Sequence, residues 1–162
     1  MGITFGTSGW RAIIADEFTL ANVRLVTRAI ASVLHEEKAG GSVIVGYDTR
    51  FLSERFAAEC AAELARLGYE AYLTTRETPT PTISYAIRTK QARGGINFTA
   101  SHNPPQYNGM KFSTADGAPA LPEITKKVET RIAEFQAGAA SFDPAPSDAA
   151  PIMLDPDRKS VV

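Results

Sequence analysis

Cysteine and histidine are nearly absent from this sequence, which holds one cysteine and two histidines in 162 residues. A single cysteine excludes a disulfide bond within the chain and is typical of a protein from a reducing compartment. Because Cys60 falls in the apolar stripe of a predicted helix, we interpret it as a core residue rather than a nucleophile. The sequence also lacks a P-loop, a dinucleotide-binding fingerprint, HExxH and CxxC, so the common nucleotide and metal sites have no support.

The sequence has neither an excess of charge of one sign nor a long apolar run. Its formal net charge of -1 gives no reason to expect nucleic acid or a membrane surface as a partner. No apolar run approaches the roughly 20 residues that a transmembrane helix needs, and no signal peptide is recognisable. We therefore expect a cytoplasmic protein. The length and the hydrophobic share of 44% fit one ordinary globular domain.

Helical and extended patterns alternate along the chain. Apolar residues at helical spacing predict helices over residues 20–34, 53–67 and 82–91 and a last one between Pro122 and Gly138, with Thr19 and Ser53 as N-caps of the first two. Extended runs cover residues 43–45, 70–74, 94–100 and 110–114, and Asn108-Gly109 predicts a tight turn before the last run. This alternation predicts an α/β fold, and the turn predicts an antiparallel strand in an otherwise mainly parallel sheet.

The composition changes after Gly138. Residues 139–162 are rich in alanine, proline, aspartate and serine, which is typical of a linker. We therefore predict a domain over residues 1–138, followed by a linker over residues 139–162 that contains no further packed element.

The stretch FTASHNPPQYNGMK, residues 98–111, places Ser101 and His102 on a proline-rich loop directly after an apolar run. A serine hydrolase is one interpretation, but the loop lacks the G-x-S-x-G pattern of a nucleophile elbow. Adjacent serine and histidine side chains also rarely face each other as a catalytic triad requires. A second interpretation is that Ser101 and Asn103 only satisfy backbone groups in a turn whose path the prolines fix.

A third interpretation is phosphate chemistry, because other polar segments of the chain are expected to meet this loop. The candidate phosphate-binding residues are Thr7, Ser8 and Arg11 in FGTSGWR, which we expect to form a compact turn, and Arg50 and Lys111 near the ends of predicted strands. Loops at the carboxyl ends of strands gather at one edge of an α/β sheet. Cations gathered around Ser101 at that edge would suit phosphate better than an acyl group.

Three segments together resemble the α-D-phosphohexomutases, the superfamily of phosphoglucomutase and phosphomannomutase: FGTSGWRA near the start, VGYDTR after the second strand, and TASHNPPQYNGMKF. The likeness runs from about Ile3 to the last helix, in the order that the family uses. Members of the family have four domains, and this chain resembles the first. The resemblance implies a three-layer α/β/α unit with a mixed, mostly parallel sheet, a second domain after the linker, and the remaining three domains as partners.

The resemblance implies a mutase that interconverts hexose 1-phosphate and hexose 6-phosphate, with glucose or mannose phosphate as substrate. Ser101 would carry a phosphoryl group, donate it to the sugar phosphate and recover it from a bisphosphorylated intermediate. Arg11 would stabilise the transferring group, and His102 and Lys111 match positions associated with acid–base and electrostatic work. We further expect Lys111 to have a lowered pKa and to act as a general base. The expected phosphate-binding residues are Thr7, Ser8, Arg50 and Asn103.

The resemblance also implies Mg²⁺, held by a phosphoserine oxygen at Ser101 and by an aspartate-rich loop of the second domain. No D-x-D-G-D segment occurs in this sequence, so the chain would supply one metal ligand, too few for a dedicated magnesium site. The sugar-recognition and phosphate-binding loops of the third and fourth domains are also missing. We therefore expect the chain alone to be inactive as a mutase. The alternative is a non-catalytic phosphate-binding or interaction module on the same fold.

Overall fold

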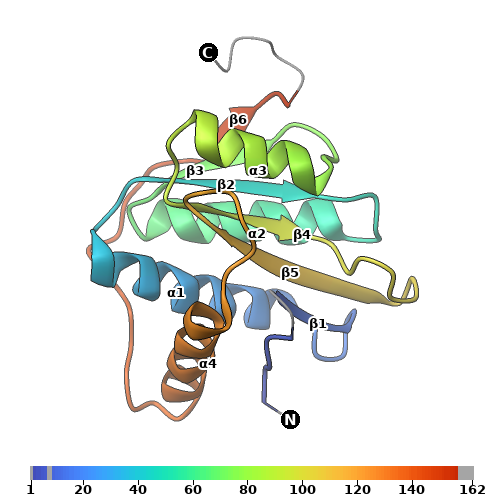
Figure 1. Ribbon diagram of the computed structural model, residues 1–162. Coiled ribbons are helices and arrows are strands. Elements are labelled where there is room, and N and C mark those ends of the chain that lie inside the picture. Colours follow the sequence, from blue (N-terminus) through green and yellow to red (C-terminus); the bar gives the residue numbers. More distant parts are fainter. Residues whose placement is uncertain (1, 7–8, 157–162) are drawn as a thin grey trace.

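The computed structural model describes residues 2–6 and 9–156, and it has the α/β architecture expected from the sequence (Figure 1). These residues form, in order, β1 (Gly9–Ile13), α1 (Leu20–Glu37), β2 (Ser42–Tyr47), α2 (Ser53–Arg66), β3 (Glu70–Thr74), α3 (Thr80–Thr89), β4 (Gly94–Phe98), β5 (Tyr107–Thr114), α4 (Pro122–Gln136) and β6 (Ile152–Leu154). The four predicted helices are confirmed. No helix in this part of the chain is long and apolar enough to cross a membrane.

A mixed sheet runs through the middle of the fold. The six strands of the described residues pair in the order β1-β5-β4-β2-β3-β6. β5 is antiparallel to both of its neighbours, whereas the pairs β4–β2, β2–β3 and β3–β6 are parallel. The prediction of a mixed, mostly parallel sheet is therefore confirmed.

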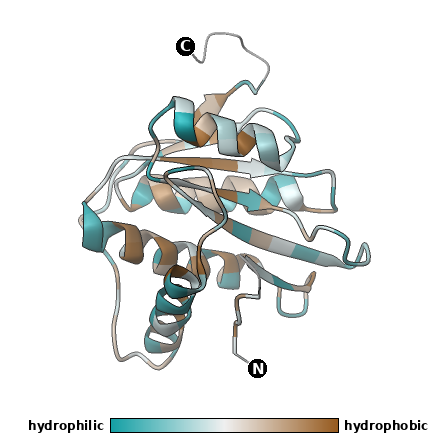
Figure 2. Cartoon of the chain, viewed as in Figure 1, coloured by the Kyte–Doolittle hydropathy of each residue, from teal (hydrophilic) through white to brown (hydrophobic). Residues whose placement is uncertain are grey.

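Helices on both faces of the sheet complete three layers. α3 packs on one face, where Ile83 and Ile87 join Ile44 of β2 in an apolar cluster. α1 and α2 cover the opposite face, where a larger cluster forms, and α4 packs beside α1 (Figure 1). Figure 2 shows that the side of α4 in view, at the outside of the fold, is largely hydrophilic. Cys60 of α2 is fully buried in the larger cluster, and burial raises the pKa of its thiol to about 12, so its interpretation as a core residue is confirmed.

Local sequence signals explain several helix ends, with one error. The Thr19 hydroxyl accepts a hydrogen bond from a backbone N–H of the first turn of α1 at 3.2 Å, which confirms the predicted N-cap. Gly68 follows the end of α2 with a φ of +86°, a left-handed conformation that glycine favours. The prediction that Ser53 caps α2 is wrong. The N-cap residue is Leu52, and the Ser53 hydroxyl donates instead to Asp48.

The predicted tight turn at Asn108-Gly109 is wrong, because both residues lie inside β5. β4 and β5 are antiparallel, as expected, but residues 99–106 connect them, and we call this segment the serine loop. Gly109 allows a close approach of neighbouring chain segments on both sides. A Cβ atom there would lie 2.5 Å from the carbonyl oxygen of Thr99 and 2.9 Å from Cγ of Arg11. Packing, rather than turn geometry, therefore requires glycine at this position.

Two further segments contain strands that the sequence did not predict. The segment expected to form a compact turn, residues 5–11, ends in β1, which pairs with β5 from Gly9 to Ile13. Before this strand, the Gly6 N–H donates to the Gly9 carbonyl oxygen at 2.9 Å, and the rest of the expected turn, residues 7–8, lies outside the described residues. The predicted linker contains β6, which pairs with β3 and buries Leu154, so the prediction that nothing packs beyond residue 138 is wrong. The run Ile-Met-Leu is too short for its periodicity to reveal a strand, and only the neighbouring edge of the sheet makes it one.

Candidate active site

Ser101 lies on the exposed serine loop with its backbone in the left-handed region, at a φ of +57°. For a residue other than glycine this conformation costs of order 1–3 kcal/mol, and it persists where surrounding contacts determine it. Two local hydrogen bonds contribute. The Ser101 N–H donates to the Thr99 hydroxyl at 3.2 Å, and the Asn103 N–H donates to the Ala100 carbonyl at 3.0 Å. The two prolines that follow fix their own φ angles, so the loop presents the serine hydroxyl in a defined geometry.

The contact between Ser101 and His102 does not have the form of a hydrolase pair. Ser101 Oγ and His102 Nδ1 are 3.5 Å apart, at the long limit of a hydrogen bond. Both residues are exposed, and among the contacts of the described residues no carboxylate orients the His102 ring. A catalytic triad needs that third group, so the geometry gives the hydrolase interpretation no support.

The carboxyl ends of β2 and β4 bring a second polar segment beside the serine loop. The two strands are parallel neighbours, and Tyr47 pairs with Phe98 where they end. The chain leaves β2 through Asp48, whose N–H donates to the Phe98 carbonyl oxygen at 3.0 Å. Residues 48–51 and the serine loop therefore leave the sheet side by side, at the edge where α/β proteins bind ligands. The predicted convergence of these two loops is confirmed.

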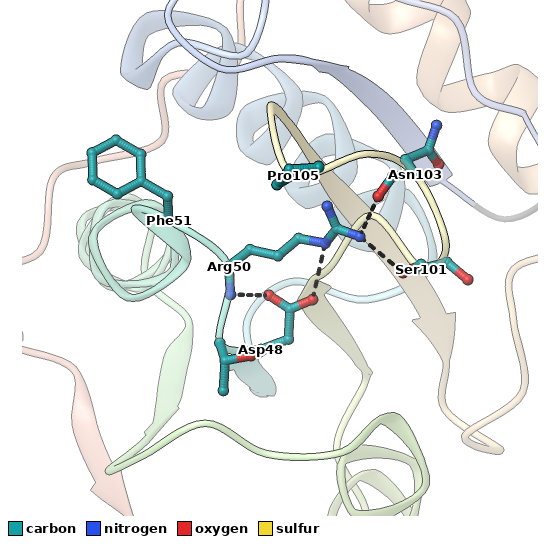
Figure 3. A pocket seen from close by; sticks show the side chains of 7 residues that line it. Asp48, Arg50, Phe51, Ser101, Asn103 and Pro105 are labelled. Atoms are coloured by element: carbon teal, nitrogen blue, oxygen red, sulfur yellow. Dashed lines mark hydrogen bonds and ion pairs between the residues drawn. The ribbon is translucent and has the colours of Figure 1, made fainter.

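Arg50 connects these two segments through its guanidinium group (Figure 3). The group donates to four backbone carbonyl oxygens in and beside the serine loop: Nη2 to those of Ser101 at 2.9 Å and Asn103 at 2.8 Å, and Nη1 to those of Pro104 at 3.0 Å and Tyr107 at 3.1 Å. Nε of Arg50 lies 3.5 Å from Oδ2 of Asp48. Arg50 therefore contacts much of the serine loop, and its expected binding of phosphate stays a prediction.

A chain of polar contacts continues from Arg50 to the start of β5. Oδ1 of Asp48 accepts hydrogen bonds from the Arg50 N–H and from the Ser53 hydroxyl, both at 2.9 Å. The Ser53 hydroxyl in turn accepts a hydrogen bond from the side-chain amide of Asn108 on β5 at 2.9 Å. Ser53 and Asn108 are fully buried. A buried polar group without a partner costs free energy. These contacts therefore favour one arrangement of the residues that lie beneath the serine loop.

Arg11 and Lys111 lie on the same face of the sheet. Arg11 pairs with Gly109 on β5, and Lys111 is two residues further along that strand, so both side chains point to one side. Burial, and then the positive charge of Arg11, lower the pKa of the Lys111 amine below 10.5, while Asp48 acts in the opposite direction. This direction agrees with the prediction. Nε of Arg11 is buried and has no hydrogen-bond partner among the described residues, which is costly for a donor of a charged group.

A cavity of about 540 Å³ opens beside the serine loop. It is lined by Asp48, Thr49, Arg50, Phe51, Ser101, Asn103 and Pro105 (Figure 3). Its volume is within the range of small-molecule sites, about 300–1,000 Å³. An exposed hydroxyl that borders such a cavity together with Arg50 suits phosphoryl transfer, which asks a protein mainly for positioning and charge neutralisation.

The predicted site residues lie on the serine loop, beside it, and on β1 and β5. Those that share the serine loop are Ser101, His102 and Asn103; Arg50 contacts the loop; Arg11 and Lys111 lie on β1 and β5. The predictions for Thr7 and Ser8 lie outside the described residues. Within the described part of the chain, no three His, Cys, Asp or Glu residues lie close enough together to hold a metal ion.

Sequence reasoning missed Asp48, Ser53 and Asn108 as parts of this site. Asp48 had a visible signal, because it stands in the YDTR segment two residues before Arg50. Ser53 had the sequence position of a helix cap, and Asn108 had that of a turn residue. Their burial and their contact with each other, 55 residues apart in sequence, show their use only in the folded chain.

One family profile matches residues 2–138, and it is described as phosphoglucomutase/phosphomannomutase, alpha/beta/alpha domain I. Among solved structures, one from Thermus thermophilus, of a protein assigned as a phosphomannomutase, superposes with a TM-score of 0.82 and 39% sequence identity. The superposition covers 96% of this chain and 33% of that one. Nearly the whole chain therefore shares its fold with part of that protein.

Curated relatives include two kinds of mutase. A phosphoglucomutase of Staphylococcus saprophyticus is 36% identical over 133 residues, which are 80% of this chain and 24% of that protein. A phosphoglucosamine mutase of Desulforudis audaxviator is 35% identical over 147 residues, which are 91% of this chain and 32% of that protein. The chain thus spans about a quarter to a third of the length of these relatives.

Proposed function

The chain belongs to the phosphoglucomutase/phosphomannomutase family, whose domain I it matches, and from this membership we propose its function. We propose that it carries the phosphoserine of a mutase that interconverts hexose 1-phosphate and hexose 6-phosphate through a bisphosphorylated sugar. One observation carries the proposal: Ser101 is exposed in a strained backbone conformation on a loop that Arg50 holds, beside a cavity of ligand size. Strain of this kind is concentrated at functional sites.

The first proposed step moves the phosphoryl group from Ser101 to the sugar. The bond between Oγ and phosphorus breaks, and a hydroxyl oxygen of the sugar phosphate forms a new bond to phosphorus. The sugar hydroxyl gives its proton to the neutral amine of Lys111, whose lowered pKa increases the share of free base at neutral pH. The leaving Oγ takes a proton from His102, whose Nδ1 lies 3.5 Å away. The bisphosphorylated sugar then reorients, and the reverse step returns its other phosphoryl group to Ser101.

Charge neutralisation is the second task of the site. A phosphoserine carries about -1.5 to -2 charges at neutral pH. Arg11, which lies on the same face of the sheet as Lys111, would donate from its guanidinium group to the transferring phosphoryl group. Asn103, which borders the same cavity, would bind phosphate together with Thr7 and Ser8. Glucose or mannose phosphate is the proposed substrate.

We propose Mg²⁺ as the cofactor, with a phosphoryl oxygen on Ser101 as the one ligand from this chain. The described residues do not fit a complete magnesium site, because they contain no cluster of three carboxylate, thiolate or imidazole groups. Asp48, the carboxylate that borders the cavity, already accepts from Arg50 and Ser53. The remaining ligands would come from aspartates of a further domain.

The remaining three domains of the family are the proposed partners, since the chain spans only part of its relatives. Ser101 and His102 are exposed in this chain, whereas phosphoryl transfer to a sugar requires that competing water be kept out. We therefore propose that these residues alone have negligible mutase activity. A reducing, cytoplasmic location fits the single buried cysteine.

The test uses protein expressed from the full reading frame that encodes this chain. We expect it to convert glucose or mannose 1-phosphate to the 6-phosphate and to carry phosphate on Ser101, detected by intact mass and peptide sequencing. Ser101→Ala is expected to lower kcat at least about 1,000-fold, as the loss of a covalent nucleophile does. Full turnover by Ser101→Ala would contradict the proposal. Binding of hexose phosphate without turnover or phosphoserine would instead indicate the non-catalytic module, and labelling by a fluorophosphonate would indicate a hydrolase.

A further inference from the structure

The geometry points to Arg50 as a positioning residue that holds the Ser101 backbone in place for phosphoryl transfer and does not itself bind the substrate phosphate. This inference rests on the proposed function, because it names the residue that sets the reach of the phosphoserine. It assigns Arg50 a different role from the one that its charge and place in the YDTR segment suggest. Three observations support it.

The first observation is the use of the guanidinium donors. A guanidinium group has five N–H bonds that can donate, and none of its atoms accepts a hydrogen bond. In Arg50, four of them are directed at backbone carbonyl oxygens of residues 101–107, at 2.8 to 3.1 Å, and Nε faces the carboxylate of Asp48. The side chain is 15% exposed. A phosphate bound by Arg50 would have to replace these contacts and leave several carbonyl oxygens of the loop without a donor.

The second observation is the backbone at Ser101 itself. Its φ of +57° is a conformation that serine rarely adopts, so nearby contacts must select it. The Ser101 N–H is held by Thr99 at 3.2 Å, and the Ser101 carbonyl oxygen is held by Arg50 at 2.9 Å. Arg50 therefore holds one of the two backbone polar groups of the residue that would carry phosphate.

The third observation is that Arg50 is itself anchored. Its backbone N–H donates to Asp48, which accepts from the Ser53 hydroxyl, and Ser53 accepts from Asn108 near the start of β5. This series of contacts runs from the sheet through the 48–51 turn to the serine loop. Ser53 and Asn108 are buried and bonded to each other, so these two side chains have little conformational freedom. The serine loop is thus positioned from two sides, by its connections to β4 and β5 and by Arg50.

Arg50→Lys is the informative substitution. Lysine keeps the positive charge but presents a point charge on a flexible stem, and it cannot replace a planar fork that reaches four carbonyl oxygens. A residue that binds phosphate by charge would tolerate lysine in part. The matched control is Arg55→Lys, because Arg55 is exposed in the first turn of α2, close to Arg50 in sequence and outside the site.

Kinetics on protein from the full reading frame separate the two roles. For Arg50→Lys we expect kcat to fall about 10- to 100-fold, since a misplacement of about 1 Å can cost that much, while KM for the hexose phosphate changes less than about threefold. Arg55→Lys should match the wild type in both constants. A large rise in KM with unchanged kcat would show that Arg50 binds substrate phosphate, and unchanged constants would show that it does neither. Either result would overturn the inference.

Hydrogen exchange gives a readout that does not depend on mutase activity. In Arg50→Lys, amides of residues 99–107 should exchange at least about tenfold faster than in wild type, while peptides from α1 and β2 keep their protection. Asp48→Asn, which weakens the anchor of Arg50, should change the same peptide in the same direction. Unchanged exchange of residues 99–107 in both variants would refute the inference. If the wild-type protein lacked mutase activity but showed this exchange pattern, the proposed function would fail and the structural role of Arg50 would stand.

Discussion

Arg11 and Lys111 lie diagonally across two paired strands, and each has a glycine as its partner: Arg11 pairs with Gly109, and Lys111 pairs with Gly9. The absence of side chains on these partners lets the two long side chains lie close to the sheet. A Cβ atom on Gly109 would be 2.9 Å from Cγ of Arg11, and one on Gly9 would be 3.1 Å from Cγ of Lys111. The two cations are thus held as neighbours on one face. The positive charge of Arg11 disfavours the protonated form of Lys111.

The amine of Lys111 should titrate below a lysine in free solution. Burial and the charge of Arg11 lower its pKa, and both effects act on the charged form. The measurement is the rate of amine acylation at Lys111, followed by peptide mass spectrometry from about pH 7 to pH 11, with a short lysine peptide as reference. We expect the rate to reach half of its maximum at a lower pH than in the reference. A midpoint at or above that of the reference would contradict the effect of burial on this side chain.

Removing the charge of Arg11 should raise the pKa of Lys111. In Arg11→Gln the like charge is absent while Lys111 stays on the same strand, so the acylation midpoint should move to higher pH. Arg11→Lys keeps a positive charge at the position and is the matched control. Its midpoint should stay closer to that of the wild type. Equal midpoints in all three proteins would show that burial alone sets the pKa.

The fold was predictable where local pattern and packing agree. In α1, apolar residues such as Val23, Val26 and Ile30 recur at helical spacing, and all three are fully buried. The capping hydroxyl of Thr19 gave the same boundary. Because hydrophobic periodicity records which face of an element meets the core, the predictions of helices and of α/β layers were confirmed.

The predictions that failed depend on contacts between distant residues. Asn108-Gly109 is a strong local turn signal, yet β1 and β4 on either side of β5 hold both residues in an extended strand. The carbonyl oxygens that Arg50 contacts are separated from it by 51 to 57 positions in the sequence, so no local pattern can reveal these contacts. The residue types of the site were therefore predictable from the sequence, but the direction in which Arg50 points was not.

Gly109→Ala should destabilise the fold. The new methyl group would lie 2.5 Å from the Thr99 carbonyl oxygen and 3.1 Å from the Trp10 carbonyl oxygen, and backbone atoms cannot move away without separating the strands. Overpacking of this kind costs about 1–3 kcal/mol. Urea unfolding measures the free energy of unfolding, and Gly6→Ala is the control. Among the described residues, a Cβ atom on Gly6 would approach only the Gly9 carbonyl oxygen, at 3.8 Å, so that variant should stay within about 0.5 kcal/mol of wild type. Equal free energies of unfolding for the two variants would show that β5 can accommodate a methyl group at position 109.

Glu63→Gln should lower stability more at neutral pH than in acid. Glu63 of α2 is buried, and burial alone would raise the pKa of its carboxyl, but hydrogen bonds from Arg66 and Arg28 outweigh burial and lower the pKa below 4.5. A carboxyl with a lowered folded pKa contributes stability above its unfolded pKa and loses that contribution as the pH falls through the folded value. We expect the variant to lose about 2 kcal/mol at pH 7, the contribution of hydrogen bonds to a charged group, and this difference should shrink by about pH 3.

The measurement for Glu63→Gln is urea unfolding at both pH values, with Glu17→Gln as the control. Glu17 is exposed in the turn before α1, so its substitution should change stability by less than about 0.5 kcal/mol at either pH. The comparison separates charge from packing, because glutamine has nearly the same shape as glutamate and retains one acceptor oxygen for Arg66 or Arg28. A difference that stays the same at both pH values would show that the shape of the Glu63 side chain, rather than its charge, stabilises the contact between α1 and α2.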